Sequence, residues 1–198
     1  MNNPTLGIIG GGQLGSLLGI AAKKISIKTV VLSDDVNAPA RNFSNEFIYG
    51  KYDDLKKINE FLKKVDLVTY EFENIPYNIL NKINQSKKVL PKPKINRLIQ
   101  NRLTEKDFIN KLNIRTTSYV SIKNNKDLKS SSNLIPGILK TCMLGYDGKG
   151  QYKIDSVENL NDLNLDFSKE YILEKKVKLK KEISVIITRF DSHKYEIY

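Results

Sequence analysis

The sequence predicts an α/β protein: an open parallel sheet of the Rossmann type, followed by a smaller α+β module. Two observations predict the parallel sheet. Short apolar runs alternate with segments of helical spacing through the first ninety residues, and a glycine-rich turn follows the first run. A third observation predicts the second module. Beyond Ile114, short strand-like runs outnumber helical ones, as in a mostly antiparallel sheet.

The first half repeats a strand–helix unit. Apolar runs predict strands at 5–10, 28–34, 66–72 and 87–91. The first helix is predicted from apolar residues at helical spacing, namely Leu14, Leu17, Leu18, Ala21, Ala22 and Ile25. Asp53 and Asp54 cap a second helix at 55–65, and Pro76 suits the first turn of a third. Repeated units of this kind place helices on both faces of the sheet.

A change of pattern marks the second half. Two prolines, at 91 and 93, precede a helical stretch through Leu103, Phe108 and Leu112. We therefore expect one domain at 1–100 and a second at 101–198. The predicted strands of the second lie at 116–122, 136–140, 151–154, 170–177, 182–190 and 194–198, with a helix at 156–163 and a loop at 129–133. Because the last residue lies in or just after a strand, we expect this domain to be incomplete.

Composition disfavours several classes of protein. Of 198 residues, 40% are hydrophobic and 28% charged, and no apolar run is long enough to span a bilayer. No secretory signal is expected, and the single cysteine, Cys142, is consistent with the cytoplasm. The net charge of +11 attracts anions. The lysines are scattered without a nucleic-acid motif, which favours small phosphorylated ligands over nucleic acid.

The first glycine cluster has the spacing of a dinucleotide-binding turn. Gly10, Gly12 and Gly15 lie between a predicted strand and a predicted helix, and Asp34 and Asp35 follow about twenty residues later. Glycines let an anion approach backbone N–H groups at a helix N-terminus. The pattern indicates an anion of some kind rather than a nicotinamide cofactor specifically. A tight turn without a ligand stays open as an alternative.

The second glycine cluster predicts a hairpin flap. Lys140 ends one strand, the loop Gly145–Gly150 follows, and the next strand resumes at Gln151, so the P-loop spacing is absent. Backbone amides of such a flap can cover phosphates, while a plain turn is the alternative. Glu174 and Glu182, each expected at a strand end, add carboxylates that suit ribose hydroxyls.

These motifs together resemble the ATP-grasp superfamily and, within it, the N5-carboxyaminoimidazole ribonucleotide synthetases. The resemblance rests on GIIGGGQLG near the start, YEFENIP at 70–76, NRLTEK at 101–106, LKTCMLGYDGKGQ at 139–151 and ILEKKVKLKKEISVI at 172–186. They stand in the family's order and span nearly the whole chain.

The resemblance implies a pre-ATP-grasp domain that binds a ribonucleotide, followed by part of an ATP-grasp domain. It implies ATP-dependent carboxylation of 5-aminoimidazole ribonucleotide with bicarbonate, through carboxyphosphate, in purine biosynthesis. Mg²⁺ would be a cofactor, and a full-length member would be a homodimer. The implied ATP-binding residues are Arg102, Lys140, Gly145, Tyr146, Asp147, Gly148, Lys149, Gly150, Gln151, Glu174, Lys175, Lys176, Val177 and Glu182. The implied substrate-binding residues are Gln13, Leu14 and Glu73.

The chain departs from the family in length and in detail. Members are nearly twice as long, and the remainder holds the magnesium ligands, so no metal ligand is expected here and no ATP turnover by this chain alone. Ser16 stands where a basic residue is usual, and Leu144 where glycine is common. Cys142 is interpreted as a packing residue and His193 as a turn residue.

Three alternatives stay open. Another ATP-grasp ligase, such as a formate-dependent glycinamide ribonucleotide transformylase or a biotin carboxylase, would share the flap and the glutamates. An NAD-dependent oxidoreductase would use Gly10–Gly15 and Asp34 but leave Lys140 and the flap unexplained. A non-enzymatic nucleotide-binding fragment is the third.

Overall fold

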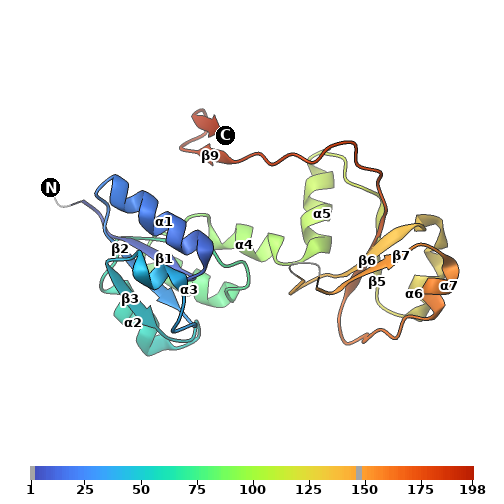
Figure 1. The fold of residues 1–198 in the computed structure, drawn as a ribbon, viewed down its shortest axis with the longest axis horizontal. Helices are drawn as coiled ribbons and strands as arrows, with labels where there is room; N and C mark the ends of the chain where they lie inside the picture. The colour runs from blue at the N-terminus through green and yellow to red at the C-terminus, as the bar shows by residue number, and fades with distance from the viewer. Residues whose placement is uncertain (1–2, 146–148) are drawn as a thin grey trace.

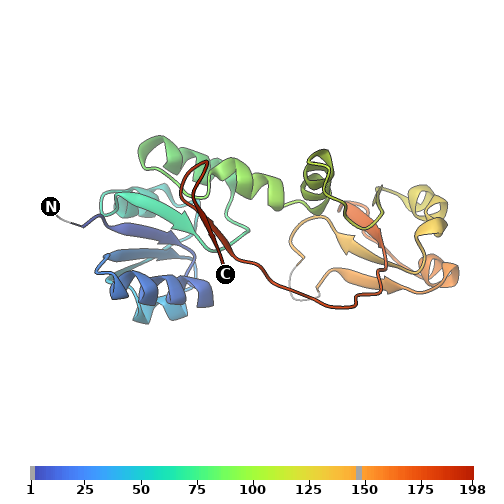
Figure 2. The ribbon, with the colours of Figure 1, turned by 90° about the horizontal axis from the view of Figure 1, so that it is seen from above.

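The computed structural model describes residues 3–145 and 149–198, which form two lobes joined by a pair of helices (Figures 1 and 2). The joining helices are α4 (Pro93–Ile99) and α5 (Arg102–Lys111). None of the helices within the described ranges has the length and apolar character needed to cross a bilayer.

The first lobe is built on a parallel sheet with the strand order β3-β2-β1-β4. Its strands are β1 (Leu6–Ile9), β2 (Thr29–Ser33), β3 (Glu46–Tyr49) and β4 (Leu67–Tyr70). Its helices are α1 (Gln13–Lys24), the 3₁₀ turn η1 (Pro39–Asn42), α2 (Leu55–Leu62) and α3 (Tyr77–Ser86). The predicted parallel sheet is confirmed.

Alternate residues of the strands enter separate cores on the two faces of this sheet. Ile9 and Leu32 pack with Phe61 of α2 and Ile83 of α3 on one face. Ile8 and Val31 pack with Ala40 of η1 on the other. Residues one apart on a strand point to opposite faces, so an apolar run with no polar alternation needs cover on both sides.

Two predictions about this sheet are wrong. The segment 87–91 is not a strand: Val89 makes only an isolated parallel bridge to Val68, beyond the edge strand β4. Conversely, β3 went unpredicted because its residues, EFIY, show no strong pattern, and only Ile48 is buried.

The first helix also differs from its predicted orientation. Its buried residues are the small ones, namely Gly15, Ser16, Gly19 and Ala22, whereas Leu14 and Leu17 are more than half exposed. The approach to the sheet is too close for a larger side chain, because a Cβ on Gly15 would lie 2.8 Å from the carbonyl oxygen of Gly10. Close packing therefore overrides the apolar stripe.

The second lobe is built on an antiparallel sheet with the order β5-β8-β6-β7. Its strands are β5 (Tyr119–Ile122), β6 (Gly137–Thr141), β7 (Gln151–Ile154) and β8 (Tyr171–Lys175). Its other elements are α6 (Asn125–Ser130), the 3₁₀ turn η2 (Ser132–Leu134) and α7 (Val157–Asn161). The expected loop at 129–133 is instead the end of α6 and the start of η2.

The chain ends in an extended strap, residues 176–186, and a small antiparallel ribbon of β9 (Ile187–Arg189) and β10 (Tyr195–Ile197). The ribbon lies apart from the second sheet, on the side of the first lobe (Figures 1 and 2). The predicted strand at 182–190 is therefore too long, because the strap has no neighbouring strand to pair with. His193 lies in the ribbon's turn, as expected, where its backbone N–H donates to Asp191.

Gly15→Ala tests the close contact between α1 and β1. We expect the free energy of unfolding to fall by about 1–3 kcal/mol, because the added methyl group overpacks against the Gly10 carbonyl. Chemical denaturation measures the change. Lys23→Ala, on the exposed side of the same helix, is the control and should have little effect. Equal stability of the two variants would contradict the contact.

Candidate functional site

The strands on either side of the second glycine cluster, β6 and β7, pair as an antiparallel hairpin, as predicted. Lys140 of β6 pairs with Gln151 of β7, and the N–H of Thr141 donates to the Gly150 carbonyl. Gly150 has a φ of +69°, and a Cβ there would lie 2.6 Å from the Thr141 hydroxyl oxygen. Glycine is therefore required where the flap rejoins its strand. Tyr146, Asp147 and Gly148 lie outside the described residues.

A buried carboxylate lies beneath this flap. Glu174 of β8 is only 7% exposed, and the Lys140 ammonium donates to its Oε2 at 2.7 Å. The Lys106 ammonium of α5 lies 3.3 Å from its Oε1. A buried charge is stable only when paired, and here two ammonium groups share one carboxylate. The structure thus brings together Lys140 and Glu174, as predicted, and adds Lys106, which sequence reasoning missed.

Arg102 ties the helix pair to the flap. Its backbone N–H donates to the Cys142 carbonyl at 2.9 Å, and its Nη2 donates to the Gly145 carbonyl at 2.7 Å. One residue earlier, the Asn101 side chain donates to the Glu170 carboxylate. On the other side, the Gln100 amide donates to the carbonyls of residues 73 and 75 in the first lobe. The three consecutive residues 100–102 therefore bind both lobes, Gln100 the first lobe and the other two the second.

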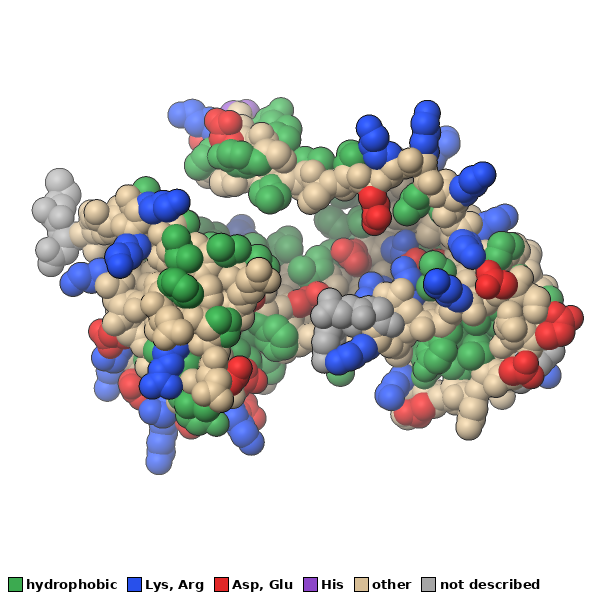
Figure 3. Space-filling view, viewed as in Figure 1, with side chains coloured by type: hydrophobic (Ala, Val, Ile, Leu, Met, Phe, Trp, Pro, Cys, Tyr) green, Lys and Arg blue, Asp and Glu red, His purple; other side chains and the backbone are tan. Residues whose placement is uncertain are grey.

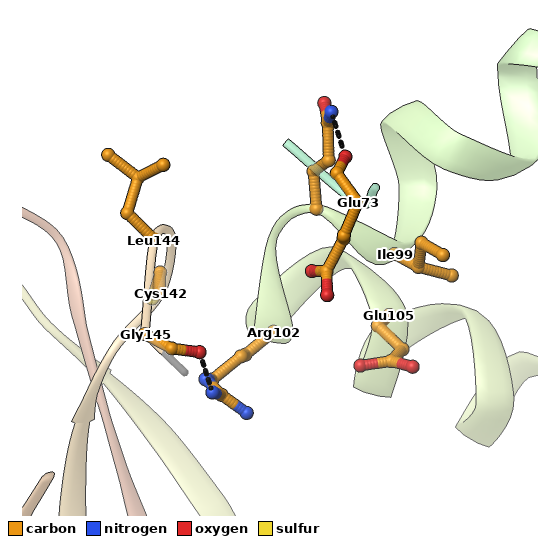
Figure 4. Close-up of a pocket in the computed structure, with 8 residues that line it drawn as sticks. Glu73, Ile99, Arg102, Glu105, Cys142, Leu144 and Gly145 are labelled. Atoms are coloured by element: carbon orange, nitrogen blue, oxygen red, sulfur yellow. Dashed lines mark hydrogen bonds between the residues drawn. The ribbon is translucent and has the colours of Figure 1, made fainter. Parts of the chain in front are cut away.

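A cavity of about 150 Å³ lies between the lobes at this junction. It is lined by Arg102 and Glu105 of α5, Gly145 of the flap and Glu73 of the first lobe. Figure 4 shows the Glu73 carboxylate pointing into the space between Arg102 and Glu105. Partial burial raises the pKa of Glu105, and the charges of Glu73 and Glu174 raise it further, against the opposing effect of Arg102 and Lys106.

The first glycine cluster already holds an internal anion. The backbone N–H of Gly12 donates to the Glu71 carboxylate at 2.8 Å, and a Cβ on Gly10 would lie 2.7 Å from the same oxygen. Gly10 also has a φ of +106°, so glycine is doubly required there. In a dinucleotide-binding protein this space receives the pyrophosphate. Glu71 therefore weighs against the oxidoreductase alternative.

The predicted ribonucleotide residues do not all share one cavity. Gln13 and Leu14 form the exposed start of α1, and their backbone N–H groups have no acceptor among the residues described. Glu73 lines the cavity beside Arg102, and neither Gln13 nor Leu14 does. A ribonucleotide that contacts both Glu73 and the start of α1 must therefore extend outside this cavity.

The predicted adenine strip follows Glu174 along β8 and into the strap. The N–H groups of Lys175 and Lys176 donate to the carbonyls of Ser118 and Pro136. Val177 is 55% exposed, and within 3–145 and 149–198 its N–H has no acceptor. Glu182 is exposed in the strap rather than at a strand end and has no hydrogen-bond or ion-pair partner in the described part of the chain.

Neither a reactive thiol nor a metal-binding cluster is found among the described residues. Cys142 is 1% exposed, and burial raises the pKa of its thiol to about 11, so it is protonated at neutral pH and unsuited to nucleophilic attack. No cluster of His, Cys, Asp or Glu side chains that could hold a metal ion occurs among the described residues.

Comparison with known families divides the chain in two. Residues 3–100 match the ribonucleotide synthetase preATP-grasp domain, and residues 107–198 match the ATP-grasp domain. The N5-carboxyaminoimidazole ribonucleotide synthase of Staphylococcus aureus strain COL is 36% identical over 197 residues, which cover 98% of this chain and 53% of the relative. The chain thus spans about half the length of the relatives it matches.

Solved structures agree with this comparison. The N5-carboxyaminoimidazole synthetase of S. aureus, complexed with ADP, superimposes with a TM-score of 0.91 at 35% identity, covering 98% of this chain and 53% of that one. The carboxyaminoimidazole ribonucleotide synthase of Aspergillus clavatus, complexed with ATP, gives a TM-score of 0.83 at 25% identity, covering 99% and 53%.

Glu105→Gln tests the electrostatics of the cavity. Because the folded-state pKa of Glu105 is raised, its contribution to stability is fully present below the unfolded-state pKa and is lost as the pH rises through the folded-state value. We therefore expect the variant to melt at a higher temperature than the parent at pH 7, and the difference to shrink towards pH 4. Thermal melts across this range measure it. A variant that melts lower at pH 7 would contradict the raised pKa.

Proposed function

This chain belongs to the ribonucleotide synthetases of the ATP-grasp superfamily, and from that membership we propose that it forms the ribonucleotide-binding domain and part of the ATP cleft of an N5-carboxyaminoimidazole ribonucleotide synthase. The complete enzyme would carboxylate 5-aminoimidazole ribonucleotide with bicarbonate at the expense of ATP. The division into two domains falls at the junction of α4 and α5.

The observation that supports a triphosphate site most directly is the pairing of Lys140 with Glu174 beneath a glycine-bounded flap. The Lys140 side chain is 18% exposed, so its charge is partly desolvated and interacts strongly with a nearby anion. Arg102 supplies a second cation at the flap, where its guanidinium lies against the Gly145 carbonyl. An ATP phosphate chain between these groups would receive donors from both lysine and arginine.

The strap supports the adenine end of the same ligand. Val177 lies two residues beyond β8, its backbone N–H has no acceptor among the described residues, and the edge of a base can accept from such a donor. The N–H groups of Lys175 and Lys176 already donate to the carbonyls of Ser118 and Pro136, so these lysines would contribute side chains or carbonyl groups. Glu182 would serve the ribose hydroxyls, because its exposed carboxylate has no partner among the described residues.

The ribonucleotide would bind on the first lobe. The amides of Gln13 and Leu14, which have no acceptor in the described parts of the chain, form a helix start that suits a phosphate, since Glu71 already accepts from the neighbouring Gly12 amide. Glu73 faces Arg102 across the inter-lobe cavity, so a ligand at Glu73 would lie near the flap. A flap closing over both ligands would keep water from carboxyphosphate.

Magnesium and assembly remain predictions. The acidic side chains of the described residues do not form a metal site, so no step of the reaction is assigned to Mg²⁺ on this chain. A homodimer and a cytoplasmic location are carried over from the resemblance, and bicarbonate as the carbon source has the same basis.

Lys140→Met tests the nucleotide site. We expect ATP to bind the variant more weakly by about 1.5–3 kcal/mol, the worth of one charge-assisted hydrogen bond. Calorimetric titration of the 198-residue chain measures the affinity. Lys129→Met, an exposed lysine of α6, is the matched control. Unchanged affinity for Lys140→Met, or protection by NADH rather than ATP, would count against the proposal.

The identity of the ribonucleotide has its own test. We expect 5-aminoimidazole ribonucleotide to raise the melting temperature of the chain more than glycinamide ribonucleotide does, because the family match lies with the imidazole enzymes. Thermal shift at equal ligand concentrations makes the comparison. Glu73→Gln should reduce the shift. The opposite ligand order would favour the glycinamide enzyme.

A further inference from the structure

We propose that Lys106 is a positioning residue of the nucleotide site: it pairs with Glu174 and so leaves the charge of Lys140 available to an anionic phosphate ligand. The identity of that ligand rests on the function proposed above. The pairing itself rests only on the geometry of three side chains, which come from α5, β6 and β8.

The three side chains form a compact cluster. Lys140 lies 2.7 Å from one oxygen of Glu174, and Lys106 lies 3.3 Å from the other. All three are largely withdrawn from water, with side-chain exposures of 18% for Lys140, 17% for Lys106 and 9% for Glu174. At such burial, charges interact more strongly than they do on an open surface.

The count of charges explains why a second lysine is needed. Lys140 and Glu174 alone would form a neutral pair, and a neutral pair offers little attraction to a polyphosphate. Adding Lys106 leaves the cluster with one net positive charge. The carboxylate then has two partners, so an anion can compete for the Lys140 ammonium without leaving Glu174 buried and unpaired.

The surroundings of Lys106 hold it in this role. Its ammonium also lies 5.6 Å from the centre of the Tyr119 ring, on the strand that pairs with β8. The Tyr119 hydroxyl donates to Asp107, the next residue on α5. The helix is thus attached to β5 through Tyr119 next to the lysine, which keeps the ammonium near Glu174.

A double-mutant cycle tests the inference on the 198-residue chain. The variants are Lys106→Met, Glu174→Gln and the two combined. Methionine keeps the apolar length of lysine, and Lys111→Met on the exposed end of α5 is the control. Lys106→Gln replaces Lys106→Met if the latter does not fold. The probe is ATP without added metal, titrated by calorimetry at two salt concentrations.

We expect the loss of ATP affinity caused by Lys106→Met to depend on whether Glu174 is present. Lys106→Met should weaken ATP binding about tenfold when Glu174 is present, and Lys106→Arg should recover most of the loss. In the Glu174→Gln background the same change should cost less than about twofold, because the carboxylate that Lys106 neutralises is gone. Equal losses in both backgrounds, or no loss in either, would overturn the proposal.

A second readout needs no nucleotide and so separates this inference from the proposed function. The rate of acetylation of Lys140 by an amine-reactive ester can be followed by peptide mass spectrometry. Lys106→Met should slow it about threefold, because Glu174 then pairs with Lys140 alone, and Glu174→Gln should speed it. If the parent chain binds no ATP, the acetylation rate still tests the pairing. Slower acetylation of Lys140 in Lys106→Met supports it, and an unchanged rate overturns it.

Discussion

The second lobe is organised around one buried carboxylate. Glu174 lies on β8, an inner strand of the antiparallel sheet, where water reaches little of it. A charge in that position must be neutralised by groups from neighbouring elements. Lys140 comes from the adjacent strand β6, and Lys106 comes from the helix α5. The requirement to pair Glu174 therefore fixes α5 against the sheet and brings the cations to the base of the flap.

A comparable solution appears in the first lobe. There the glycine turn after β1 exposes an N–H that would attract an outside anion, and Glu71 at the end of β4 supplies an internal one. The Glu71 carboxylate thus occupies the position at the glycine turn where a dinucleotide-binding protein would hold a pyrophosphate. In both lobes a glutamate accepts from a donor beside the proposed ligand position: from the Gly12 amide in the first lobe and from the Lys140 ammonium in the second.

Features specified by neighbouring residues could be predicted from the sequence. Asp54 caps α2 as expected, and β6 pairs with β7 on either side of the predicted glycine-rich loop. The pairing of Glu71 with Gly12 could not be predicted, since it joins residues 59 apart, and Lys106 looks in sequence like any solvated helical lysine. The prediction that the leucines of α1 face the sheet was wrong for a related reason. The space between α1 and the sheet admits only small residues, and the order of residues along the chain does not reveal that space.

The terminal ribbon has a consequence for how the molecules behave in solution. Ile183 of the strap, and Phe190 and Tyr198 beside the ribbon strands, are each more than 60% exposed, and the edges of β9 and β10 pair with nothing else in the described chain. Figure 3 shows this apolar surface next to a strap bearing many lysines. An open edge with apolar side chains adheres to its copies, while like charges hold the copies apart. Added salt weakens only the repulsion, so colloidal behaviour should worsen as ionic strength rises.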